Sequence, residues 1–71
     1  MNFAEFVVYC AEHRDDIPHL RDGQYYMNQL WYHNRNLYSL IANTDIDPFY
    51  DDRFMLDYWN FLMANWSDND E

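Results

Sequence analysis

The stretch TDIDPFYDDRF, residues 44–54, sets four aspartates around a proline and two aromatic rings. Aspartate is a preferred N-cap, and proline suits the first turn of a helix because an N–H group has no partner there. Asp47 followed by Pro48 therefore marks a turn or helix start. One of the next two aspartates is expected to cap a last helix over about 52–65, and Phe49 is expected to turn into the core.

Three earlier helices are expected, at about 3–14, 22–33 and 35–42. Asn2 and Glu5 have the spacing of a capping box at the start of the first helix. Asp22 is the expected N-cap of the second helix and Asn34 that of the third. Asn43 can adopt the left-handed conformation that closes a helix.

Apolar residues recur at helical spacing in each segment, which predicts a buried stripe on every helix. The expected stripes contain Phe3, Phe6, Val7 and Cys10; Met27, Leu30 and Trp31; Leu37, Leu40 and Ile41; and Phe54, Met55, Tyr58, Phe61 and Leu62. No segment shows the alternation of a strand bounded by turns. The pattern predicts an all-α fold, a compact bundle of three to four short helices with no sheet. We expect a single domain over 1–66 and a frayed acidic tail at 67–71.

Charge and cysteine content limit the function classes. Thirteen acidic residues face four basic ones, all arginine, and the net charge of −9 repels nucleic acid and anionic membranes. This charge suits a basic partner, although it also keeps an aromatic-rich protein soluble. With one cysteine, no signal-peptide pattern and no apolar run near the length of a membrane span, the cytoplasm is the expected compartment.

Motifs for catalysis or metal binding are weak. Cys10 and His13 lie three residues apart, but a structural zinc site needs a second pair of ligands that is missing. The run Asp45, Asp47, Asp51 lacks the glycine and the final glutamate of a calcium loop. No carboxylate pair or Ser–His–Asp arrangement is singled out. We therefore expect no enzyme, no cofactor and no metal site.

Protein recognition is the remaining expectation. Tyrosine and tryptophan are favoured at interface hot spots, and aspartate clusters steer a protein toward a basic surface. Seven Tyr, five Phe and three Trp are many for one small core, so some rings are expected at its edge or outside it: Tyr9, Tyr25, Tyr32, Tyr38 and Trp66. The predicted partner-binding residues are Asp45, Asp47, Tyr50, Asp51 and Asp52, and the wider anionic groups add Asp57 and, separately, Asp15, Asp16 and Asp22.

Two kinds of role fit such a surface. One is a binding protein that attaches to the basic surface of a partner protein, in a specialised form by imitating the charge of nucleic acid. The other is a structural or assembly module, such as a homodimer held by exposed aromatic rings.

A polar segment before the second helix is interpreted as structural. Gly23 permits close approach of another backbone at the helix start, and Gln24 or Asn28 can satisfy buried backbone groups. Arg21 can pair with one of the aspartates in residues 47–52 and fix that loop on the bundle.

The order of these features resembles a group of short proteins encoded by tailed bacteriophages and prophages. The shared segments are Arg-x-Gly-Gln, Asn-x-Leu, and Asp-Pro-Phe-Tyr-Asp-Asp before a last helix that ends in Trp. They correspond here to Arg21, Gly23, Gln24, Asn28, Leu30, Asp47, Pro48, Phe49, Tyr50, Asp51, Asp52 and Trp66. The chain differs from the group at Asn34–Arg35, where Asp–Pro is common, and at Asn43, where Gly is common; both changes keep the capping residues.

The group has no settled activity. The resemblance implies a phage accessory protein, and small acidic phage proteins often occupy host nucleases or defence complexes. It therefore implies an anti-defence or host-takeover inhibitor in the cytoplasm of a bacterial host.

Overall fold

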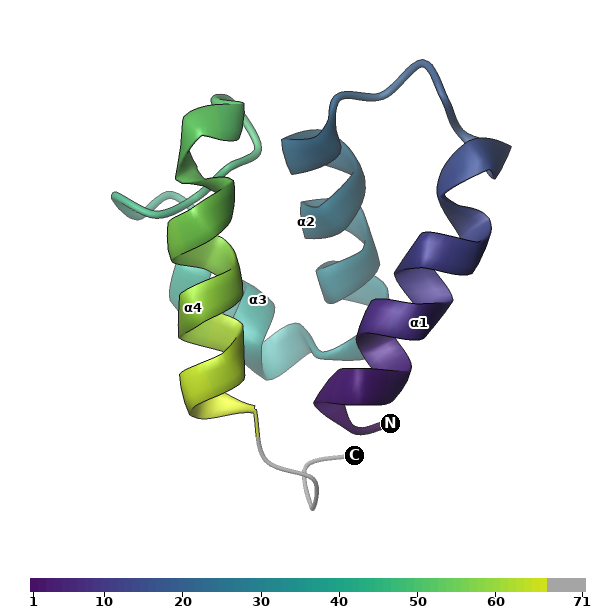
Figure 1. Cartoon of the computed structure of the whole chain (residues 1–71). Coiled ribbons are helices and arrows are strands. Elements are labelled where there is room, and N and C mark those ends of the chain that lie inside the picture. The colour runs from purple at the N-terminus through teal and green to yellow at the C-terminus, as the bar shows by residue number, and fades with distance from the viewer. Residues whose placement is uncertain (67–71) are drawn as a thin grey trace.

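A computed structural model describes residues 1–66 as four α-helices and two short 3₁₀ helices (Figure 1). The α-helices are α1 (Phe3–His13), α2 (Asp22–His33), α3 (Arg35–Ile41) and α4 (Met55–Asn65), and the 3₁₀ helices are η1 (Arg14–Asp16) and η2 (Asp52–Phe54). No strand occurs in this part of the chain, so the predicted all-α bundle is confirmed. The predicted tail, 67–71, lies outside the described residues.

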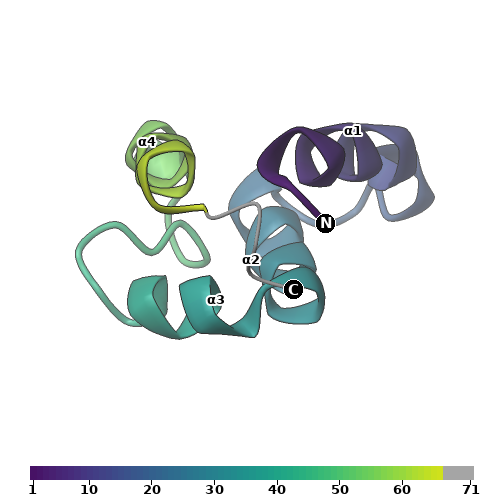
Figure 2. The same ribbon diagram turned by 90° about the horizontal axis from the view of Figure 1, so that it is seen from below.

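The helices form two layers. Seen from below, α1 and α4 lie on one side and α2 and α3 on the other (Figure 2). Helix α2 contacts α1, α3 and η2, and α3 also contacts α4. At the lower end in Figure 1, the start of α1 meets the end of α4, where the Trp66 Nε1–H donates to the Met1 carbonyl at 3.1 Å.

Most of the predicted helix caps are confirmed. Glu5 N–H donates to Asn2 Oδ1 and Asn2 N–H to Glu5 Oε1, each at 2.8 Å, which completes the capping box. Asn34 Oδ1 accepts from Leu37 N–H at 3.1 Å at the start of α3. Asn43 has a φ of 64°, the left-handed conformation expected of it.

The N-cap predicted for α2 is wrong. Arg21 occupies that position and Asp22 is the first helical residue. The Asp22 carboxylate binds Arg14 Nη2 at 3.0 Å, so a partner on η1 uses the group that was expected to cap the helix. Gln24 Oε1 instead accepts the Arg21 N–H at 3.2 Å.

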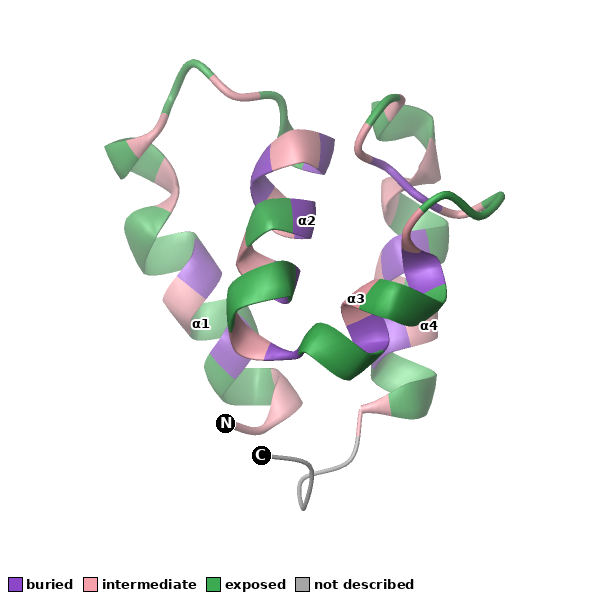
Figure 3. Ribbon diagram, turned by 180° about the vertical axis from the view of Figure 1, so that it is seen from behind, coloured by how far each residue is buried: buried purple, intermediate pink, exposed green. Residues whose placement is uncertain are grey.

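Within residues 1–66, nine buried hydrophobic side chains form the core between the layers (Figure 3). They are Phe6, Cys10, Tyr25, Met27, Leu30, Leu37, Ile41, Tyr58 and Leu62. Val7, Trp31 and Leu40 were expected in the buried stripes and are exposed. The buried face of each of these helices is therefore narrower than the apolar stripe predicted from the sequence.

Tyr25 was expected at the edge of the core and is fully buried. Its hydroxyl donates to the Cys10 carbonyl at 2.7 Å, and the Arg14 guanidinium covers its ring at 4.8 Å from the centroid. A satisfied hydroxyl removes the main cost of burying a tyrosine.

Four rings join α1 to α4 at the lower end of the bundle. Phe6 and Trp66 have ring centroids 5.0 Å apart, and Phe3 lies 6.2 Å from Trp59 and 6.0 Å from Trp66. We call these four residues the aromatic cluster. Trp66 is therefore part of the packing rather than fully exposed, as are the half-buried Tyr9 and Tyr38.

Candidate binding groove

The acidic stretch that the sequence singled out forms the loop between α3 and η2. Asp47 is buried within it: its Oδ2 accepts from Asn43 N–H at 2.7 Å and its Oδ1 from Phe49 N–H at 2.9 Å. The carboxylate thus satisfies two backbone donors where the chain leaves α3 and passes Pro48.

Asp52 holds the far end of this loop against α2. Its Oδ1 accepts from Arg21 Nη1 at 2.9 Å and from Gly23 N–H at 3.0 Å, and Arg21 Nη2 donates to the Phe49 carbonyl at 2.7 Å. We call Arg21, Gly23, Phe49 and Asp52 the clamp. The pairing predicted between Arg21 and an aspartate of this loop is confirmed.

Gly23 makes the clamp possible. A Cβ atom at this position would lie 1.8 Å from the Pro48 carbonyl oxygen, far inside van der Waals contact. Only glycine lets the backbone of the loop approach the first turn of α2 this closely, so the predicted close approach is also confirmed.

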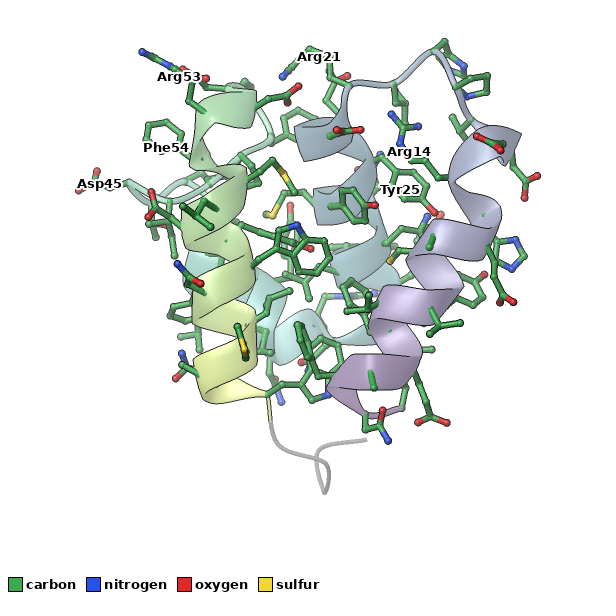
Figure 4. The ribbon with its side chains drawn as sticks, in the orientation of Figure 1. Arg14, Arg21, Tyr25, Asp45, Arg53 and Phe54 are labelled. Carbon is green, nitrogen blue, oxygen red and sulfur yellow. The ribbon has the colours of Figure 1, made fainter. Side chains whose placement is uncertain are left out.

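Asp51 and Asp45 have different surroundings. Asp51 accepts the Arg53 N–H at 2.9 Å as the cap of η2, and Arg53 Nη2 lies 2.6 Å from its Oδ2. The hydrogen bonds from Arg53 lower the pKa of the Asp51 carboxyl. Asp45 is exposed at the outer edge of the loop, away from the helices (Figure 4).

These four aspartates therefore do not form one solvent-facing anionic surface, which a binding site built from all of them would require. Asp47, Asp51 and Asp52 bind backbone amides or arginines of the same chain, because a loop of this shape leaves N–H groups that must be satisfied. Among the predicted site residues, Asp45 and Tyr50 are exposed and their side chains make no hydrogen bond or ion pair with the described residues. In the second predicted group, Asp16 lies 3.1 Å from His13 and Asp22 binds Arg14, while Asp15 is exposed.

All four arginines bind the chain itself. Arg14 donates to the carbonyls of Ile17 and Leu20 at 2.8 and 2.6 Å as well as to Asp22. Arg35 donates to the Trp31 carbonyl and covers the Trp31 ring at 3.9 Å. Within residues 1–66, the exposed acidic residues with no ion pair to an arginine or histidine include Glu12, Asp15, Asp45 and Asp57.

A groove of about 530 Å³ runs along the outer face of α2 and was not predicted from the sequence. Tyr25 lies in its floor, and the rings of Trp31, Tyr32, Tyr38 and Phe49 line it. We call this feature the aromatic groove. Its size is typical of ligand pockets. The groove could have been predicted from one feature of the sequence: the spacing of Tyr25, Asn28, Gln29 and Tyr32 places them on one face of a helix.

Asn28 and Gln29 supply the polar groups of the aromatic groove. Neither side chain has a hydrogen-bond partner among the described residues, so both present a free amide. Of the two residues predicted to satisfy backbone groups, Gln24 or Asn28, Gln24 is the one that binds backbone, at the Arg21 N–H.

A smaller recess of about 130 Å³ adjoins the aromatic groove. Tyr38 and Phe49 line both hollows. Asn43, Asp47 and Tyr50 complete the recess together with Met27 and Ala42. We call it the Asp47 recess.

The other candidate chemistries remain without a site in the described part of the chain. No three His, Cys, Asp or Glu side chains in residues 1–66 are placed to hold a metal ion. Cys10 is buried, and this burial raises the pKa of its thiol to about 12, which keeps it protonated and unreactive at neutral pH. None of the described helices has both the length and the apolar character that crossing a membrane requires.

No protein-family model, curated protein or solved structure matches this chain.

Proposed function

We propose that this chain is a non-enzymatic protein whose acidic surface binds a basic surface on a partner protein. The observation that carries the proposal is the division of charge. The chain has a net charge of −9, and each arginine is bound to oxygen atoms of the chain itself. Acids such as Glu12 and Asp57 are left to attract a cationic surface.

The resemblance to phage accessory proteins adds a partner class to this proposal. The partner would be a bacterial host protein that handles nucleic acid, and occupation of its basic surface would inhibit it. Imitation of a row of phosphates by Asp45, Asp47, Asp51 and Asp52 is not part of this proposal. Three of these four carboxylates bind arginine or backbone N–H groups of the same chain.

The test starts with capture from a nuclease-treated bacterial lysate and continues with the purified partner. If charge drives binding, the dissociation constant should rise steeply toward about 1 M salt, where the Debye length falls to about 3 Å. The variant Glu12→Gln/Asp15→Asn/Asp45→Asn/Asp57→Asn removes four charges without touching a described hydrogen bond, and it should bind at least tenfold more weakly, which is about 1.4 kcal/mol.

The matched control is Asn36→Ala/Asn60→Ala, which changes exposed polar residues outside both the aromatic groove and the smaller recess and leaves the charge intact. Affinity that is unchanged by salt and by the four-charge variant would overturn the proposal, as would failure to retain any protein. If only the control loses binding, the contact lies at the polar residues of α3 and α4 and not at the acids, which would also overturn the proposal.

A second candidate function is a structural or assembly module that forms a homodimer. It is favoured by Leu56 and Met63, which lie seven residues apart on one face of α4 and are 70% and 64% exposed. Sedimentation velocity over a range of concentrations distinguishes the two candidates. A concentration-dependent dimer that Leu56→Gln/Met63→Gln abolishes supports the module; a monomer at all concentrations excludes it.

A further inference from the structure

Asp47 carries a charge whose surroundings are unusual in this chain. It is 9% exposed, and no arginine or histidine of the described residues pairs with it. An ionised carboxylate has about four sites that accept hydrogen bonds. The Asn43 N–H occupies one acceptor site on Oδ2 and the Phe49 N–H one on Oδ1, so each carboxylate oxygen can still accept another hydrogen bond. A buried charge of this kind is stabilised when a cation reaches it.

The walls of the Asp47 recess suit a cation as well. Tyr38, Phe49 and Tyr50 line it, and the faces of aromatic rings attract cationic groups. Phe49 and Tyr50 stand nearly perpendicular, with centroids 4.9 Å apart, so they form two walls of a corner. Tyr50 is 76% exposed and therefore keeps the recess in reach of a partner.

The size of the recess limits the ligand to one side chain. At about 130 Å³ it is smaller than the range of about 300–1,000 Å³ typical of small-molecule sites. The adjoining aromatic groove has room for the backbone on either side of that side chain, and the amides of Asn28 and Gln29 can bond a peptide backbone there.

We infer that the Asp47 recess binds an arginine side chain of the partner protein, an inference that rests on the proposed function. Arginine fits better than lysine because its planar guanidinium stacks on rings and donates to both oxygens of one carboxylate. The chain already uses this contact internally, since Arg14 covers Tyr25 and Arg35 covers Trp31.

The experiment is an NMR titration of the full chain with three small probes. N-acetyl-arginine amide should shift the backbone amide signals of Asn43, Phe49 and Tyr50 in a saturable way. N-acetyl-citrulline amide has nearly the same shape without the charge and should shift none of them. N-acetyl-lysine amide should bind more weakly than arginine; equal binding would overturn the choice of arginine.

Variants separate the recess from the rest of the surface. Tyr50→Ala should weaken arginine binding by about 3- to 30-fold, the range expected of a cation–π contact. Leu56→Ala is the matched control, because Leu56 is similarly exposed, at 70%, and lines neither the recess nor the aromatic groove. Asp47→Asn should abolish binding; if that variant does not fold, Tyr50→Ala and Tyr38→Leu decide the matter.

The inference is overturned if arginine shifts no signals at the recess, if citrulline shifts the same signals, or if Tyr50→Ala and Leu56→Ala behave alike. Its failure is distinct from failure of the proposed function. If a partner binds in a salt-sensitive way and its affinity is unchanged by Tyr50→Ala, the inference about the recess is rejected and the proposed function stands. If the arginine probe binds but no partner is captured, the proposed function is rejected and the recess still binds arginine.

Discussion

The clamp and the aromatic cluster hold opposite ends of the bundle by different chemistry. At one end, Arg21 and Asp52 join the loop to α2 through directed hydrogen bonds between half-exposed groups. At the other end, Phe6 and Trp66 join α1 to α4 by burying aromatic surface. We therefore expect burial at the aromatic cluster to contribute more to stability than the solvent-screened clamp, whose hydrogen bonds fix the position of the loop that carries the Asp47 recess.

The largest expected effect is at the aromatic cluster. Phe6→Ala should lower the free energy of unfolding by about 3–5 kcal/mol, because it leaves a cavity where a fully buried ring stood. Urea denaturation followed by circular dichroism measures this. Val8→Ala, an exposed position on the same helix, is the control and should cost less than about 0.5 kcal/mol. Similar losses in the two variants would contradict the importance assigned to burial.

Gly23→Ala tests the clamp by steric overlap and is expected to have the next largest effect. Alanine favours a helix by about 1 kcal/mol, but its Cβ would meet the Pro48 carbonyl at 1.8 Å. The net loss should be about 1–3 kcal/mol, the usual cost of overpacking. Asn28→Ala in the same helix is the control. A more stable Gly23→Ala protein would show that the loop gives way easily.

Alkaline pH should weaken the core and spare the clamp. Burial raises the pKa of Cys10 and of Tyr25 to about 12, from ordinary values of 9.0 and 10.0. The unfolded chain therefore loses these protons first, so stability is complete below pH 9 and falls between pH 9 and 12. Cys10 alone should account for about 1.4 kcal/mol at pH 10.

Thermal unfolding across this pH range measures the effect. In Cys10→Ala the decline should start about one pH unit later, near the ordinary pKa of tyrosine. If stability begins to fall at pH 9 in both the unchanged protein and Cys10→Ala, a group other than the Cys10 thiol causes the fall.

Arg21→Ala should have the smallest effect of the four. The side chains of Arg21 and Asp52 are 44% and 45% exposed, and solvent screens such pairs. We expect a loss of about 1 kcal/mol, or about 4–8 °C in Tm, and a smaller loss at high salt. Arg53→Ala is the control, with no resolvable change expected, because its side chain is 85% exposed and joins only the neighbouring Asp51. An unchanged Tm in Arg21→Ala would refute a stabilising role for the clamp.

Local features of the fold could be predicted from the sequence. The capping box at Asn2, the Asn34 cap and the left-handed Asn43 depend on residues within a few positions of each other. The helix bounds follow from such signals, because a cap and a stripe of apolar residues are written in consecutive positions. Asp22 was misassigned because its partner, Arg14, lies eight residues away.

The candidate site depends on contacts across the chain, and the sequence does not encode these locally. Asp52 is 29 residues from the Gly23 N–H from which it accepts a hydrogen bond. The sequence therefore predicted that Arg21 pairs with an aspartate of the loop, but not that this aspartate is Asp52 or that it also binds Gly23. The same holds for Tyr25, whose burial depends on the Cys10 carbonyl in another helix. The sequence identified Asp47 and Tyr50 as residues of interest, but the Asp47 recess exists only once α2, α3 and the loop are packed together.

The contact between Gly23 and the Pro48 carbonyl also limits how this loop can change in length. Surface loops generally accept insertions and deletions. Here one added or removed residue between Ile41 and Pro48 would shift the proline carbonyl off the only position in α2 that lacks a side chain. Related chains that keep this architecture should therefore conserve the number of residues in the segment even where its polar residues differ.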